Sequence, residues 1–206
     1  NLDMAKVALE EAKEKILSFS SSETAPFSKF YKASAAYRKA IGPAGEFYKA
    51  ALMYLSYTPM DALSDEEKYD LATDVAMSAI TGEDIYNFGE VLATPILSHL
   101  EDTSNQWMCD LVVALHEGSI DKFNTIVDSN RDKYSSYPTL VDGLPGLKKK
   151  VVLLALINIA FERNANDRQI SFSDIAGRTH IDMDQVEWVI MRAMSLNLVR
   201  GSIDQV

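Results

Sequence analysis

Residues 168–203 read RQISFSDIAGRTHIDMDQVEWVIMRAMSLNLVRGSI, and this stretch decides the fold of the 206-residue chain. Its first five residues, 168–172, alternate polar and apolar side chains, which predicts a short strand. Apolar side chains then recur at helical spacing and predict a helix from about residue 182 to Asn197. The run at 198–203 predicts a second strand after that helix.

Two shorter elements lie between the first strand and the helix. Ser173 is expected to be the N-cap of a brief helix over residues 174–178, and residues 179–181 form the turn that follows. Strand, short helix, turn, helix and strand in this order are typical of a winged helix. The sequence stops at Val206 after one arm of the wing, so we expect a wing truncated at the C-terminus.

The rest of the chain is predicted to be a series of helices joined by short turns. Helices are expected at about residues 3–19, 27–41, 88–93 and 95–100, between Pro43 and Pro59, after Ser64, and around Trp107 and Phe123. Ser64, followed three residues later by Glu67, matches a capping box. Such helices pack as antiparallel pairs, and a row of pairs makes a right-handed solenoid. The sequence shows only weak self-similarity at repeat periods of 34 to 45 residues. The solenoid prediction therefore depends on the regular alternation of helices and short turns.

The sequence changes character after Tyr137-Pro138, before a long apolar helix expected at about residues 147–163. We therefore predict a helical-repeat segment over residues 1–137 and a winged-helix module over residues 138–206. The fold class is mostly α, with a solenoid that continues into a winged helix. Scarce glycine and proline, 9 and 6 residues, favour helix in the same way.

Composition excludes several classes of protein. The formal net charge of −10 argues against a non-specific phosphate-binding surface. Cys109 is the only cysteine, so the chain has no internal disulfide and no cysteine-based zinc cage, as expected in a reducing compartment. The longest apolar run, residues 151–161, is too short to cross a bilayer and contains Asn158, so we expect no membrane association.

A winged helix often reads DNA, but the charges of the expected recognition helix argue against nucleic acid. The helix has three acidic residues, Asp182, Asp184 and Glu187, and one basic residue, Arg192. Acidic side chains at the start of a recognition helix repel phosphate. We interpret them as a solvated acidic face. The one basic cluster, Lys148-Lys149-Lys150, is interpreted as a solvated helix start. The preceding Gly143-Leu-Pro-Gly146 resembles a nucleic-acid-clamping loop only in its glycines and is interpreted as an ordinary start of a helix.

No catalytic, metal or cofactor site is expected. The histidines, His99, His116 and His180, lie in three regions, and Cys109 is seven residues from His116, roughly 10 Å by helix rise. That separation is too long for a Cys-His dyad or for joint ligation of one zinc ion. No metalloprotease, nucleophile-elbow or phosphate-loop motif occurs. The aromatic residues Phe27, Phe30, Tyr31 and Tyr37 could form a ligand shelf, but their helical spacing favours core packing.

Several short stretches, together with helical repeats that continue directly into a winged helix, carry a family resemblance. These stretches are Tyr37–Lys39, Gly45–Lys49, Leu55–Pro59, Ala160–Arg163, Arg168–Phe172, Ile175-Ala176, Val186-Glu187, Met191, Ala193–Leu196 and Leu198–Asp204. They resemble the PCI-domain family, and the likeness is strongest to the members in the lid of the 26S proteasome regulatory particle. Other PCI subunits belong to the COP9 signalosome and to translation initiation factor three.

The resemblance implies a non-catalytic scaffold in the cytoplasm and nucleus that assembles with other PCI-domain lid subunits into a hetero-oligomer supporting ubiquitin-dependent degradation. An open strand edge suits such contacts, because it offers backbone donors and acceptors to a neighbour. The hypothesised partner interface is the expected strand, Leu198, Val199, Arg200, Gly201, Ser202 and Ile203, together with the adjacent helix face. Two alternatives stay open: a PCI scaffold of a sister complex, and a winged-helix protein that binds nucleic acid.

Overall fold

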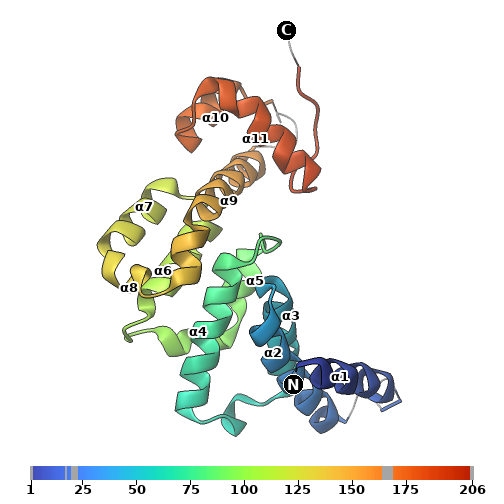
Figure 1. Ribbon diagram of the computed structural model, residues 1–206. Coiled ribbons are helices and arrows are strands. Elements are labelled where there is room, and N and C mark those ends of the chain that lie inside the picture. Colours follow the sequence, from blue (N-terminus) through green and yellow to red (C-terminus); the bar gives the residue numbers. More distant parts are fainter. Residues whose placement is uncertain (1, 17, 20–22, 164–168, 205–206) are drawn as a thin grey trace. The chain divides into compact units, whose positions relative to one another are not determined.

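The structure is a computed structural model that describes residues 2–16, 18–19, 23–163 and 169–204 (Figure 1). The regular elements of these residues are all helices. The chain folds into two compact units, one formed by Asn1–Ile85 with Glu90–Cys109 and the other by Tyr86–Gly89 with Asp110–Val206. None of the described helices is both long and apolar enough to span a membrane.

The first unit consists of successive helices that pack on their neighbours in sequence. Its elements are α1 (Leu2–Ile16), α2 (Thr24–Ile41), α3 (Ala44–Tyr57), η1 (Met60–Ala62), α4 (Asp65–Thr81) and η2 (Pro95–Leu100). Helices α5 (Phe88–Ala93) and α6 (Gln106–His116) contribute residues to both units. Ser64 begins α4 with the predicted capping box: its side chain accepts from the amide of Glu67, and the Glu67 carboxylate accepts from the amide of Ser64.

A constant sequence separation of 35 residues links the helices of the first unit. Lys32 pairs with Glu67 and Lys39 with Asp74 between α2 and α4, each across 35 residues. The pairs that join Lys49 to Asp84 and Tyr69 to Ser104 have the same separation. Equal separations are expected when equivalent helices of consecutive repeats lie in one register. The helical repeats are therefore confirmed. Internal sequence similarity showed their period only weakly.

The second unit is built around a long helix. Its elements are α7 (Ile120–Ser129), α8 (Arg131–Ser135), α9 (Pro138–Glu162), α10 (Phe172–Thr179) and α11 (Met183–Ser195). Helices α7, α8, α10 and α11 all contact α9. Tyr137 is the N-cap residue of α9, so the change of character seen in the sequence coincides with the start of this helix. The domain boundary placed after residue 137 stays a prediction.

The expected start of α9 was wrong by about nine residues. The helix begins at Pro138, where the missing N–H of proline costs no hydrogen bond because the first amides of a helix have no partner in it. Pro145 lies inside the helix, so Gly143–Gly146 is part of α9 and is not its start. An internal proline removes one backbone hydrogen bond, and the long apolar part of α9 after it compensates through packing.

The helix-turn-helix is formed by α10 and α11, but its cap differs from the prediction. Ser171, and not Ser173, is the N-cap of α10: its hydroxyl accepts from the amide of Asp174 at 3.1 Å. Ser171 has the extended backbone that an N-cap needs, whereas Ser173 is already helical. His180 ends α10 in the left-handed conformation, with φ of 53°.

The two predicted strands are a further correction. Of the first, residues 169–171 are irregular and Phe172 begins α10, while Arg168 lies outside the described residues, as does the polar break at 164–167. In the second predicted strand, residues 198–203, Leu198 is a bend, and residues 199–203 have no regular structure and pair with no described segment. A strand exists only when a second backbone completes its hydrogen bonds, so an alternating or β-branched pattern is not sufficient.

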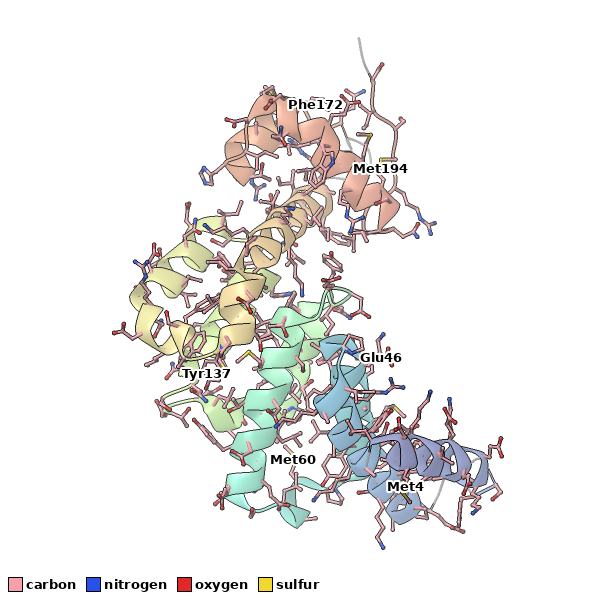
Figure 2. All side chains as sticks on the ribbon, viewed as in Figure 1. Met4, Glu46, Met60, Tyr137, Phe172 and Met194 are labelled. Carbon is pink, nitrogen blue, oxygen red and sulfur yellow. The ribbon has the colours of Figure 1, made fainter. Side chains whose placement is uncertain are left out.

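A small core holds the C-terminal helices together. Its buried members are Leu153, Leu156, Ile175, Val186, Val189 and Ala193, from α9, α10 and α11. Phe172, at the start of α10, packs against this core (Figure 2). Leu198 and Val199 also pack against it, which anchors the segment that follows α11.

Candidate protein-interaction surface

The segment 198–203, predicted as the partner interface, leaves the C-terminal core as an extended chain. Asn197 has a positive φ of 56°, and the amide of Leu198 donates to the carbonyl of Ala193 at 3.0 Å, which turns the backbone at the end of α11. The following residues, Arg200, Gly201 and Ser202, are exposed. The segment therefore starts on the core and then presents its backbone to solvent.

Two of the three acidic residues named for this helix, Asp182 and Asp184, lie at the N-terminal end of α11, and Glu187 lies one turn further on. Asp182 is the N-cap residue and Asp184 is in the first turn, whereas Arg192 is in the last turn. This order complements the helix dipole, which is positive at the N-terminus. The helix dipole therefore explains why acidic residues lie at this end of α11. In DNA-binding helix-turn-helix proteins the same end of the recognition helix contacts the bases, and here Asp182 and Asp184 make it acidic.

The exposed side of α11 carries Trp188, which the sequence analysis did not single out, and Met191, which was named only for the family resemblance. Val186, Val189 and Ala193 form the buried side of the helix. Trp188 and Met191 lie away from that side, and each is 49 % exposed. Helical spacing could have revealed them, because both fall between the buried positions in the helical pattern.

Two ion pairs connect α10 to the end of α9. Arg178 forms a bidentate pair with Glu162, and Arg163 pairs with Asp174 at 3.0 Å. The hydrogen bonds between Arg178 and Glu162 lower the pKa of Glu162 and raise that of Arg178. Both arginines line a surface hollow between α9 and α10, together with their two carboxylates. Because each cation is already paired, this hollow does not form a phosphate-binding site.

Lys150 corrects the interpretation of the basic cluster as a solvated helix start. Lys148 and Lys149 are exposed, but Lys150 is only 5 % exposed. Its Nζ lies 4.9 Å from the ring centroid of Phe88 and 5.7 Å from that of Tyr86. These distances are typical of cation–π contacts, so Lys150 is a core residue and no part of a basic surface.

Cys109 and His180 each contact a neighbour within their own unit of the structure. Cys109 Sγ lies 3.6 Å from the carbonyl of Leu97, and His180 Nε2 lies 3.5 Å from a carboxylate oxygen of Asp121. Within residues 2–16, 18–19, 23–163 and 169–204, no group of three or more histidine, cysteine or acidic side chains could hold a metal ion.

The aromatic residues near the N-terminus pack on one another. Phe27 and Tyr31 both stack on Tyr57, with ring centroids 4.9 and 5.7 Å apart, and Phe30 meets Tyr31 edge to face. The rings of Phe27, Tyr31 and Tyr57 are partly buried between α2 and α3. These contacts favour core packing, and not a ligand shelf, as the role of the three rings. Tyr37 makes none of these ring contacts.

Comparison with known proteins separates the chain into two matched regions. Residues 1–112 match the family of PSD13 N-terminal repeats, and residues 118–206 match the PCI domain. The first region corresponds to the helices with the 35-residue register, and the second contains α7 to α11.

Individual relatives agree with these matches. The 26S proteasome non-ATPase regulatory subunit 13 of Dictyostelium discoideum is 37% identical over 99% of this chain and 53% of its own length. The probable 26S proteasome regulatory subunit rpn9 of Schizosaccharomyces pombe is 36% identical over 100% of this chain and 52% of its own length. A subunit M of eukaryotic translation initiation factor 3 from Aspergillus fumigatus is 23% identical over 73% of this chain and 32% of its own length.

The chain thus spans about half the length of these proteasome relatives. Helical repeats, the PCI match and the relatives' identities all lead to the same assignment. The chain belongs to the family of 26S proteasome non-ATPase regulatory subunit 13.

Proposed function

We propose that this chain is a structural part of the lid of the 26S proteasome regulatory particle and assembles there with other PCI-domain subunits. The observation that carries the proposal is the match of both regions, PSD13 repeats and PCI domain, to one kind of proteasome subunit. The weaker likeness to a translation initiation factor subunit makes a sister complex the second choice.

The proposed role is non-catalytic. Among the described residues, histidine, cysteine and acidic side chains do not gather into a metal-binding group, and Cys109 contacts a backbone carbonyl. The chain would therefore support ubiquitin-dependent degradation by holding other subunits in place. The proposed location is the cytoplasm and nucleus.

The segment 198–203 is the proposed contact. It is anchored by Leu198 and Val199, and its exposed backbone beyond them is free to pair with a strand of a neighbouring subunit. Strand addition depends on backbone N–H donors and not only on side chains. Proline, which has no N–H, therefore tests this contact directly.

The experiment compares variants of the full-length protein in co-purification with recombinant PCI subunits of the lid. Replacing both Val199 and Ile203 with Asp is expected to abolish co-purification, but Val199 also packs on the core. Ser202→Pro removes one amide at an exposed position and is expected to weaken assembly without changing the melting temperature. Ser202→Ala keeps the amide and is the matched control. Normal assembly of the proline variant would contradict the proposed contact.

A nucleic-acid function predicts a different result. A phosphate-binding surface would give duplex binding that falls steeply with salt. The acidic start of α11 and the paired arginines of α9 and α10 argue for weak binding only. Tight binding to duplex DNA or RNA near physiological salt would therefore favour the nucleic-acid alternative over the lid role.

A further inference from the structure

The outer face of α11 carries two large side chains that are half exposed, Trp188 and Met191. Trp188 and Met191 are three residues apart, so their side chains are neighbours on the helix surface. Asp184, four residues before Trp188, lies on the same face and is exposed. We call the surface formed by Asp184, Trp188 and Met191 the α11 face.

Packing within the second unit does not account for this face. The core contacts of α11 are made by Val186, Val189 and Ala193, on the other side of the helix. A single exposed apolar residue is ordinary on a protein surface, but an adjacent tryptophan and methionine form a contact patch. Tryptophan and methionine are enriched where proteins bind one another, and tryptophan is a frequent hot-spot residue.

Charge indicates which partner fits the patch. Asp182 and Asp184 are exposed at the N-terminal end of α11, and the whole chain has a net charge of −10. A partner with basic residues is attracted to this end, whereas phosphate is repelled. The apolar part of the patch needs an apolar side chain opposite it. Complementarity therefore requires a protein segment that combines apolar and basic residues.

We propose that the α11 face docks an apolar segment flanked by lysine or arginine on a neighbouring PCI subunit. This inference rests on the proposed function, because the partner is a lid subunit, but it concerns a surface other than segment 198–203. Leu198 and Val199 pack on the C-terminal core, and the α11 face points away from the buried side of that helix. Variants can therefore test the two surfaces separately.

The first test measures the dissociation constant of the full-length protein with recombinant lid PCI subunits. Trp188→Ala and Met191→Ala are each expected to weaken binding by about tenfold or more, as hot-spot truncations do. Met4→Ala is the matched control, because it removes a methionine that is more exposed, at 72 %, from α1. Both positions on α11 are half exposed, so thermal melting is expected to be unchanged.

The second test addresses charge. Asp184→Lys is expected to weaken binding strongly at low salt and less at high salt, because salt screens exposed charges. Asp128→Lys makes the same change in net charge at an exposed position of α7 and serves as its control. Equal effects of the two lysine variants would mean that only net charge matters, which would overturn the basic character proposed for the partner.

The third test observes Trp188 itself. The chain has two tryptophans, and Trp107 is buried at 3 % exposure. In a Trp107→Phe background, acrylamide quenching of fluorescence reports on Trp188 alone. We expect strong quenching in the free protein and several-fold weaker quenching after assembly with the lid PCI subunits.

The outcomes separate this inference from the proposed function. If Ser202→Pro weakens assembly while Trp188→Ala, Met191→Ala and the quenching of Trp188 show no effect, the α11 inference is overturned and the lid role stands. If no lid subunit binds the parent protein or any variant, both the proposed lid role and the α11 inference are overturned. Duplex binding that Trp188→Ala removes would also overturn the inference, in favour of nucleic acid.

Discussion

The Nζ atom of Lys150 lies 4.9 Å from the centre of the Phe88 ring, inside the second unit. This contact joins the middle of α9 to the short segment Tyr86–Gly89. The residues on both sides of that segment, up to Ile85 and from Glu90, belong to the first unit. Lys150 thus helps to hold Tyr86–Gly89 in the second unit, although this segment lies in sequence between two segments of the first unit.

Lys150→Ala is therefore expected to lower the free energy of unfolding by roughly 2–3 kcal/mol. It removes a desolvated cation–π contact together with the packing of the aliphatic stem. Lys150→Met keeps most of the stem and is expected to cost less. Urea denaturation of both variants measures the difference. An unchanged midpoint for Lys150→Ala would contradict a structural role for this lysine.

Gly118 is predicted to tolerate no side chain. Its φ is +59°, and a Cβ there would lie 2.6 Å from the backbone N and Cα of Ala155 in α9. Gly118→Ala is expected to destabilise the protein by roughly 2–5 kcal/mol through backbone strain and overpacking. Gly143→Ala, in α9 with no atom within 4 Å of the added Cβ, is the control and is expected to gain up to about 1 kcal/mol. Thermal unfolding of the two variants should shift in opposite directions.

Two buried tyrosines should respond in opposite ways to loss of the hydroxyl group. The Tyr134 hydroxyl donates to the carbonyl of Leu140 at 2.6 Å, so Tyr134→Phe is expected to cost about 1–2 kcal/mol. The Tyr48 hydroxyl is buried, and no described group accepts or donates a hydrogen bond to it. Tyr48→Phe is expected to be neutral or to stabilise the protein by about 1 kcal/mol. A loss of stability in Tyr48→Phe would reveal a hydrogen-bond partner.

Both tyrosines also predict a loss of stability at high pH. Burial raises the pKa of Tyr134 from 10.0 to about 12, and burial with the nearby Glu90 does the same for Tyr48. The folded state therefore keeps these protons more tightly than the unfolded state. The stability they confer is fully present below pH 10 and is lost as pH rises from about 10 to 12. Denaturation between pH 8 and 11 should show a smaller alkaline decline for a Tyr48→Phe, Tyr134→Phe double variant than for the parent protein.

Sequence periodicity predicted most helices because their signals are local. The capping box at Ser64 and the helix limits at Gly42-Pro43 and Pro59 depend on residues within a few positions of each other. The N-cap of α10 was predicted two residues too late, because Ser171 and Ser173 have equally suitable side chains. Only the backbone conformation distinguishes them.

The candidate surface was predicted less completely than the fold. The segment 198–203 was expected as a strand, but whether it pairs depends on a second backbone that no local pattern specifies. Trp188 was overlooked because a tryptophan in a helix usually belongs to the core, and its exposed fraction is set by neighbouring helices. The 35-residue register was hidden because its pairs join different residue types, three of them opposite charges, and not identical residues.

The sequence by itself determined the helical class, most of the helices before the C-terminal module, the acidic start of α11 and the resemblance to proteasome-lid PCI subunits. These features follow from composition, short-range spacing and backbone preferences. Tertiary structure alone decided that Lys150 is buried against Phe88, that Trp188 faces solvent, and that residues 199–204 have no regular structure. Burial and strand pairing depend on residues far apart in the chain, so only the folded arrangement determines them.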